Sequence, residues 1–205
     1  MDLISALVTL LVVVDPVGLA PTFLAVTHGL PGAVRKQIAL RACLIAGAIL
    51  AGTALIGDWL LGTLGITLPA FRIAGGLLLF AVASEMVFGS RIQRQARQAE
   101  EALEEDVHNI AAFPLAIPLM AGPGAITATL LLAGRAGTQP LQLAALLAVI
   151  AIVILACLAV YLLANRITAM LGITGNVVAS RLLGVLLAAL AVQYVIDGVR
   201  VVLSG

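Results

Sequence analysis

The sequence predicts an all-α membrane protein of six transmembrane helices, arranged as two inverted-topology repeats of three helices each. Composition is the first observation behind this prediction: 62% of the 205 residues are hydrophobic and 10% are charged. A soluble domain is roughly half apolar and about a quarter charged, so a chain this apolar needs lipid as its solvent. The formal net charge of +1 also lacks the basic excess of proteins that bind nucleic acid.

The second observation is a series of six apolar runs, each close to the length of about 20 residues that crosses a bilayer once. The fifth run carries no charge and is apolar on all sides, which favours a membrane helix over a buried helix of a soluble protein. The predicted spans are Leu3–Val26, Ile38–Gly57, Ile66–Phe88, Ile110–Ala133, Leu141–Ala164 and Val177–Val202.

Two of these spans, the first and the fourth, carry proline and glycine near their middles. Asp15-Pro16-Val17-Gly18 interrupts the first, and Gly122-Pro123-Gly124 interrupts the fourth. Proline removes a backbone donor, and the freed groups need other partners inside a bilayer. We therefore expect both helices to be discontinuous.

The third observation is an internal repeat. Leu64-Gly65-Ile66-Thr67 returns as Leu171-Gly172-Ile173-Thr174, and Arg72-Ile73-Ala74-Gly75 corresponds to Arg181-Leu182-Leu183-Gly184. Each repeat has three spans, an odd number, so the second inserts upside down relative to the first, as in many secondary transporters. Glycine and proline that merely permit close helix packing are the alternative interpretation. The predicted units are the repeat 1–90, a solvated and charged cytoplasmic linker 91–109, and the repeat 110–205.

Basic residues predict the orientation in the cell inner (cytoplasmic) membrane. They concentrate in the loops after the first, third and fifth spans, whereas the opposite ends carry mainly Arg135 and Arg200. By the positive-inside rule both termini face outward, although Arg135 disagrees with this assignment. The residues in the three basic loops are Arg35, Lys36, Arg41, Arg91, Arg94, Arg97 and Arg166.

The candidate substrate site lies at the two interruptions, about 18 Å into spans about 30 Å thick. An acid at that depth is costly, so Asp15 is a functional candidate that could hold an ammonium group, bind a cation or carry a proton. The alternative is that Asp15 only caps the second half of its helix. Helix N-termini after each interruption suit a carboxylate. The predicted substrate-binding residues are Asp15, Pro16, Gly18, Thr22, Gly122, Pro123, Gly124 and Thr127.

Four further charges lie within the third and sixth predicted spans. Inverted topology brings Arg72 level with Asp197, and Glu85 level with Arg181. We predict two ion pairs between the repeats that act as gates or as structural clasps. The alternative is that each side chain extends to the nearer membrane interface.

No catalytic or metal-binding constellation is expected. Cys43 and Cys157 fall inside apolar runs, and His28 and His108 lack metal-ligand spacing. We find no nucleophile with a base at membrane depth, so we expect neither an enzyme nor a resident metal or cofactor. The phosphate-binding motif with its Gly-Lys-Ser/Thr ending is also absent from the sequence, which argues against ATP as the direct driver.

Several longer motifs point to a known family: Pro114-Leu115-Ala116-Ile117-Pro118 through Ala121-Gly122-Pro123-Gly124, Leu64–Thr67 with Arg72-Ile73-Ala74-Gly75-Gly76, and Ser180-Arg181-Leu182-Leu183-Gly184. Through these residues the chain resembles the MarC family of bacterial and archaeal inner-membrane proteins along nearly its whole length. The resemblance implies six spans, outward termini, kinship with LysE-type exporters and transport of small neutral amino acids.

Together these features lead us to expect a secondary transporter of small neutral amino acids such as glycine or alanine. Alternating access of the two repeats would couple transport to a proton or sodium gradient, for example by symport. Its partners would be the substrate, the coupling ion and the lipid bilayer, with homo-oligomerisation left open. The alternatives are an inorganic cation carrier, which too few acids at the midplane argue against, and a non-transporting membrane scaffold protein.

Overall fold

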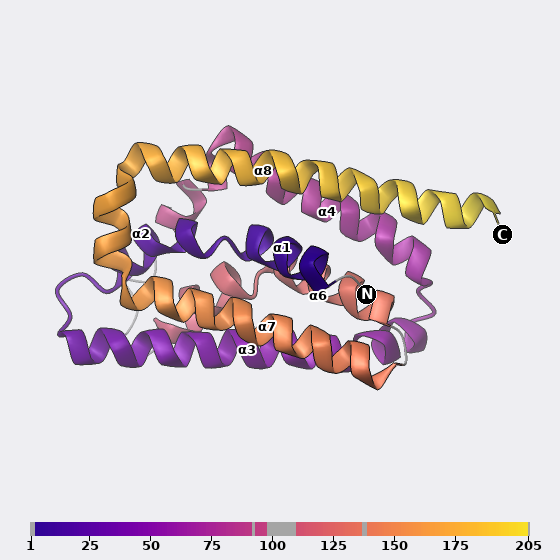
Figure 1. Cartoon of the computed structure of the whole chain (residues 1–205), viewed down its shortest axis with the longest axis horizontal. Helices are drawn as coiled ribbons and strands as arrows, with labels where there is room; N and C mark the ends of the chain where they lie inside the picture. The colour runs from indigo at the N-terminus through magenta and orange to yellow at the C-terminus, as the bar shows by residue number, and fades with distance from the viewer. Residues whose placement is uncertain (1–2, 92, 98–109, 137–138, 205) are drawn as a thin grey trace.

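A computed structural model of the chain describes residues 3–91, 93–97, 110–136 and 139–204, and every regular element within these ranges is helical. The helices run mainly along the long axis of the molecule, and both described ends of the chain lie at the same end of the bundle (Figure 1). The elements are α1 (Leu3–Val14), α2 (Pro16–Val26), α3 (Gly32–Thr63), α4 (Leu68–Phe88), η2 (Ala111–Met120), α6 (Pro123–Ala136), α7 (Pro140–Leu162) and α8 (Ala164–Ser204).

The described chain contains five or six candidate membrane spans, and the sequence predicts six. Five stretches of the described chain are long and apolar enough to cross a bilayer: Leu3–Val26, Gly32–Gly57, Leu68–Phe88, Pro140–Leu162 and Thr174–Leu203. A sixth is obtained when η2 and α6, which bend by 56° at their junction, are counted as one span. The predicted class, an all-α protein with several membrane helices, is therefore confirmed.

Two helices extend beyond their predicted apolar runs. Helix α3 begins at Gly32 rather than near Ile38, because polar residues of its first turns continue the helix past the apolar segment. Helix α8 begins at Ala164 and bends at Gly172, whose φ of 62° suits glycine. The stretch before Gly172 crosses the end of the bundle in Figure 1, and the rest of α8 runs along it.

The first span is the enclosed centre of the bundle. Helix α1 contacts α6, α7 and α8, and α2 contacts α7, α8 and η2. Residues along both are almost inaccessible, including Ala6, Leu10, Leu19 and Ala20. The outer helices instead expose large apolar side chains, which lipid would cover. Examples are Leu44 on α3, Leu77 on α4, Leu155 on α7 and Leu182 on α8.

Helices α4 and α8 form the most extensive pair in the bundle and run side by side (Figure 1). Their backbones approach closely at glycines from both helices. A Cβ atom at Gly76 of α4 would lie 2.7 Å from the carbonyl oxygen of Ala191, and one at Gly184 of α8 would lie 2.8 Å from Met86 Cβ. Small residues permit such contact between membrane helices, as the sequence suggested for some of its glycines.

We expect Gly76→Ala to destabilise the protein by about 1–3 kcal/mol, the usual cost of adding a methyl group where the packing is already tight. The matched control is Gly52→Ala in α3, where an added Cβ meets no heavy atom within 4 Å. Thermal unfolding in detergent should show a lower midpoint for Gly76→Ala and an unchanged or higher one for Gly52→Ala. Equal midpoints for the two variants would contradict the close approach of α4 and α8.

Candidate functional site

The interruption of the first span is one residue long and centres on Asp15. This residue adopts left-handed backbone angles, φ 53° and ψ 66°, between α1 and α2. Its Oδ1 atom accepts a hydrogen bond of 3.1 Å from the amide of Gly18 and so caps α2. A Cβ atom at Gly18 would lie 2.3 Å from Asp15 Oδ2, so the cap needs glycine there. The predicted discontinuity is confirmed, and the hydrogen bond from the Gly18 amide shows that Asp15 caps α2.

Arg91 satisfies the opposite side of the same interruption. In an unbroken helix the carbonyl of Val14 would accept from the amide of Gly18, but that amide binds Asp15 instead. The Nη2 atom of Arg91 donates to the carbonyls of Val13, at 3.1 Å, and Val14, at 3.4 Å. The side chain therefore replaces backbone donors that the break removed.

This role of Arg91 differs from the position in a solvated linker that the sequence predicts. Arg91 and Gln95 are each only 5% exposed, so that expectation is wrong for them. Residues 98–109 of the expected linker lie outside the described part of the chain. A usable signal was the position of Arg91, three residues after the last residue of α4, which keeps its long side chain within reach of the helix ends.

A third side chain, Ser180 of α8, reaches the interruption. Its Oγ atom donates to Asp15 Oδ2 at 3.4 Å, and Ser180 and Asp15 are 4% and 3% exposed. Burial lowers the pKa of the Arg91 guanidinium from its usual value, and the nearby Asp15 carboxylate opposes that shift. The carboxylate thus links α2, α8 and the segment that follows α4.

The fourth span is interrupted more extensively. Pro114 and Pro118 have no amide hydrogen, and η2 forms wide turns in which the amide of Ala121 bonds to the carbonyl of Ala116 at 2.8 Å. The peptide bonds that precede both prolines are cis. A Cβ atom at Gly122 would lie 2.2 Å from the carbonyl oxygen of Pro118, so only glycine fits before α6 begins. The predicted break at Gly122-Pro123-Gly124 is confirmed.

A cavity of about 370 Å³ lies between the two interruptions. Val13 contributes from the first break, and Gly122, Pro123 and Gly124 contribute from the second, as predicted. The charged and amide side chains of its wall are Glu85 on α4 and Arg91, Arg94 and Gln95 on the segment that follows.

The other predicted substrate contacts do not line this cavity: Asp15, Pro16, Gly18, Thr22 and Thr127. Thr127 instead packs against α4, where a Cβ atom at Gly75 would lie 2.8 Å from its methyl carbon. Asp15 and Gly18 are occupied by the cap described above. Of the predicted site, the structure therefore places only Gly122, Pro123 and Gly124 in the cavity wall. The charged residues that line the cavity are Glu85, Arg91 and Arg94 rather than Asp15.

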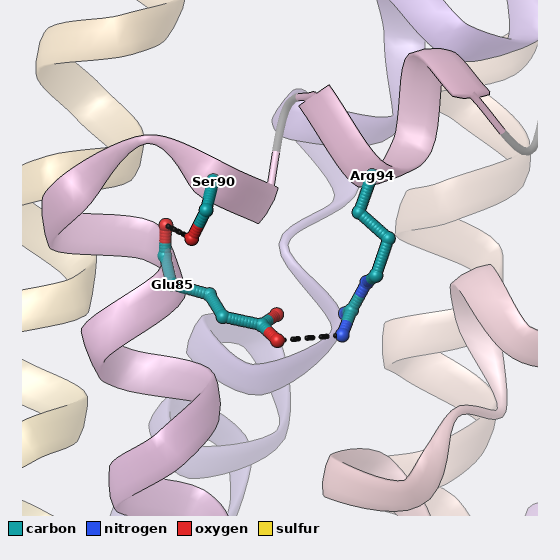
Figure 2. A network of polar contacts seen from close by, with 3 residues as sticks. All are labelled: Glu85, Ser90 and Arg94. Carbon is teal, nitrogen blue, oxygen red and sulfur yellow. Dashed lines mark hydrogen bonds and ion pairs between the residues drawn. The ribbon is translucent and has the colours of Figure 1, made fainter.

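The charged residues of the cavity wall form one ion pair, and two of their polar atoms have no hydrogen-bond partner among the described residues. Figure 2 shows Glu85 and Arg94 pointing toward each other, with Glu85 Oε1 and Arg94 Nη1 joined at 2.8 Å, while Ser90 Oγ donates to the Glu85 carbonyl at 3.5 Å. The second carboxylate oxygen of Glu85, Oε2, and the Nη1 atom of Arg91 are buried and have no hydrogen-bond partner among the described residues. One acceptor and one donor of opposite charge are thus unsatisfied in residues of the same cavity wall.

The predicted pairing of Glu85 with Arg181 is wrong. The two helices do have the expected antiparallel register, because a Cβ atom at Gly89 would lie 3.8 Å from Arg181 Nη2. Glu85 pairs with Arg94 instead. Gly89, with a left-handed φ of 80°, ends α4, and the segment that follows turns back beside the helix. Arg94 lies on this segment, and its side chain is therefore close enough to pair with Glu85.

The predicted pairing of Arg72 with Asp197 is also wrong, because Asp197 pairs with a different arginine. A Cβ atom at Gly198 would lie 3.2 Å from Arg72 Cβ, so the two positions are level. Asp197 nevertheless pairs with Arg135 at the end of α6, at 3.4 Å, and the Arg135 guanidinium also lies 4.6 Å from the centre of the Tyr194 ring. The Nε atom of Arg72 has no partner among the described residues.

Comparisons with known proteins find relatives along the whole chain. The family described as MarC family integral membrane protein matches residues 1–203. A UPF0056 membrane protein of Archaeoglobus fulgidus is 37% identical over 95% of this chain and 90% of its own length. Another from Aquifex aeolicus is 37% identical over 96% and 92%, and YhcE of Escherichia coli is 34% identical over 96% and 91%. No solved structure matches the chain.

The cap at the first interruption generates a prediction for Asp15. Asparagine keeps a cap acceptor and tolerates left-handed backbone angles, so we expect Asp15→Asn to unfold within a few degrees of the natural protein. Alanine loses the acceptor and is strained at φ 53°, so Asp15→Ala should cost about 1–3 kcal/mol. Thermal unfolding in detergent measures both. If Asn proves as destabilising as Ala, the carboxylate charge rather than the cap holds the break.

Proposed function

We propose that this chain, which belongs to the MarC family of integral membrane proteins, is a secondary transporter of small neutral amino acids. The observation that carries the proposal is the cavity between the two interrupted spans, with one unmatched carboxylate oxygen and one unmatched guanidinium nitrogen in the residues of its wall. The proposal includes no catalysed reaction, and the protein acts on its substrate by carrying it through the bilayer.

An amino acid zwitterion complements this wall. Its carboxylate would accept from Arg91 Nη1, assisted by the first amides of α6 at Gly124 and Ala125, which also line the cavity. Its ammonium group would donate to Glu85 Oε2. A simple anion would leave Glu85 Oε2 without a partner, and a simple cation would leave Arg91 Nη1 without one, at a cost in desolvation.

The size of the cavity favours a compact substrate. Its volume of about 370 Å³ lies near the lower end of the range of about 300–1,000 Å³ for small-molecule sites. Apolar residues such as Leu78, Val82 and Met120 complete the wall and suit a short aliphatic side chain. An inorganic cation carrier is the weaker candidate because Arg91 lies in the same wall.

Reciprocal contacts between α4 and α8 support an inverted repeat as the basis of alternating access. Gly198 of α8 lies against Arg72 of α4, while Gly89, just after α4, lies against Arg181 of α8. In the first pair the glycine comes from the second repeat and the arginine from the first, and in the second pair the origins are reversed. A pseudo-two-fold axis in the membrane plane would require this exchange. Ion pairs at opposite ends of the bundle, Glu85–Arg94 and Asp197–Arg135, are then the candidate gates.

The orientation that we propose is the one the sequence predicts, with both termini outside the cytoplasmic membrane. Four cationic residues, Arg35, Lys36, Arg91 and Arg94, lie around the end of the bundle where α3 begins and α4 ends. The central cavity reaches from the midplane interruptions toward this end, since Arg94 and Gln95 line it. By the positive-inside rule this end faces the cytoplasm, and the cavity opens inward.

Reconstituted liposomes test the transport function. We expect the purified protein to accumulate labelled glycine and alanine under an imposed proton or sodium gradient, compared with empty liposomes. Unlabelled alanine should compete, whereas methylamine and acetate, each bearing one charge of the zwitterion, should not. If neither amino acid moves under either gradient, transport of glycine and alanine is excluded, and the cation carrier and the scaffold protein become the favoured alternatives.

Glu85→Gln tests the proposed ammonium contact. The substitution keeps the shape of the side chain and removes its charge, so uptake of alanine at low concentration should fall about tenfold or more, given about 1.5–3 kcal/mol for a hydrogen bond to a charged group. Arg41→Gln, an exposed position on α3 that lines neither this cavity nor another described one, is the control and should retain full uptake. Equal uptake by Glu85→Gln and the natural protein would remove Glu85 from the site.

A further inference from the structure

A second, smaller cavity of about 190 Å³ lies at the end of the bundle where α2 and α7 finish and α3 and α8 begin. It is separate from the central cavity and shares no lining residue with it. Its wall contains Gly32, Arg35 and Lys36 from the start of α3, Tyr161 from α7 and Asn165 from α8, and none of the described residues that line it is acidic. Within the described part of the chain, the side chains of this wall therefore carry two positive charges and no negative one.

The start of α3 adds backbone donors to these charges. Helix α3 is 32 residues long and begins at Gly32, which lines the cavity, and the preceding Pro31 provides no side-chain cap. The first intrahelical bond of this turn runs from the amide of Arg35 to the carbonyl of Pro31. The amides before Arg35 have no acceptor within the helix, and the positive end of the helix dipole lies with them.

Tyr161 is the second independent feature of this cavity. The residue is 2% exposed, and its hydroxyl has no hydrogen-bond partner among the described residues. Its ring stacks on Phe23 with centroids 4.5 Å apart, and the Arg35 guanidinium lies 5.7 Å from the centre of the Phe23 ring. A buried hydroxyl without a partner is costly, and the aromatic pair holds Arg35 beside the start of α3.

We propose that this cavity binds a phosphate group, from a membrane lipid headgroup or from a soluble phosphate. The wall offers guanidinium, ammonium, amide and helix-terminal N–H donors, and a phosphate oxygen accepts from all of them. The position suits a lipid phosphate, because the apolar spans end here and the neighbouring Leu162 is 50% exposed beside the cavity. Basic pockets between membrane helices at this depth bind anionic lipid headgroups in other proteins.

The proposal is independent of the transport function, so its test needs no substrate. The natural protein in detergent is titrated with phosphatidylglycerol, with phosphatidylcholine and with inorganic phosphate, and binding is read from the unfolding midpoint and from native mass spectrometry. The test variant is Arg35→Gln with Lys36→Gln. The control is Arg41→Gln with Arg166→Gln, which removes two charges from the same end of the bundle and none from the cavity wall.

We expect phosphatidylglycerol to raise the midpoint and the test variant to bind it roughly tenfold more weakly, while the control changes less than about twofold. Inorganic phosphate that protects the natural protein but not the test variant, with no effect of either lipid, would support the phosphate site with a soluble ligand. Loss of binding in the control as large as in the test variant would overturn the proposal, because general attraction to the basic end would then explain it. No binding of any of the three probes would overturn it as well.

A finer variant separates binding from folding. Tyr161→Phe keeps the stacked ring and removes only the hydroxyl that lacks a partner. Without ligand its unfolding midpoint should equal or exceed that of the natural protein, since an unsatisfied buried group is removed. With the bound probe its stabilisation should be smaller, and an undiminished stabilisation would exclude the hydroxyl from the site.

Discussion

The need to satisfy every backbone polar group inside a bilayer governs this structure. The single left-handed residue Asp15 breaks the central span and leaves amides on one side and carbonyls on the other. The carboxylate of Asp15 accepts from the Gly18 amide, and the guanidinium of Arg91 donates to the carbonyls of Val13 and Val14. Each side of the break therefore has a side-chain partner for backbone groups that a continuous helix would have paired.

The same arrangement positions the candidate site. The side chain of Arg91 must extend from the segment after α4 into the bundle to reach the break. The residues that follow α4 therefore lie in the wall of the central cavity. Gly122 and Pro123 form the facing wall because the fourth span also fails to continue as a regular helix. Glu85 then faces the guanidinium donors of Arg94 rather than lipid. The contacts that satisfy backbone groups at the break therefore also place charged residues in the cavity wall.

The charged pairs show how chain connectivity decides between competing partners. The antiparallel register of α4 and α8 brings Arg181 near the end of α4 and Arg72 level with Asp197. Arg94 and Arg135 nevertheless take the two acids, because each lies on a segment that ends or turns beside them. A level position on a neighbouring helix is necessary for an ion pair but does not choose among several arginines within reach.

Hydropathy and the backbone limits of proline and glycine act locally, so the amino-acid sequence alone predicts the membrane class, the approximate spans and the sites of both interruptions. It also located Gly122, Pro123 and Gly124 in the cavity wall. Packing in three dimensions shows that Asp15 serves as a cap and that Glu85, Arg91 and Arg94 supply the charges of the cavity wall. Those roles depend on which side chain, distant in the sequence, lies close in space to an unsatisfied backbone group. A local sequence pattern does not specify that spatial distance.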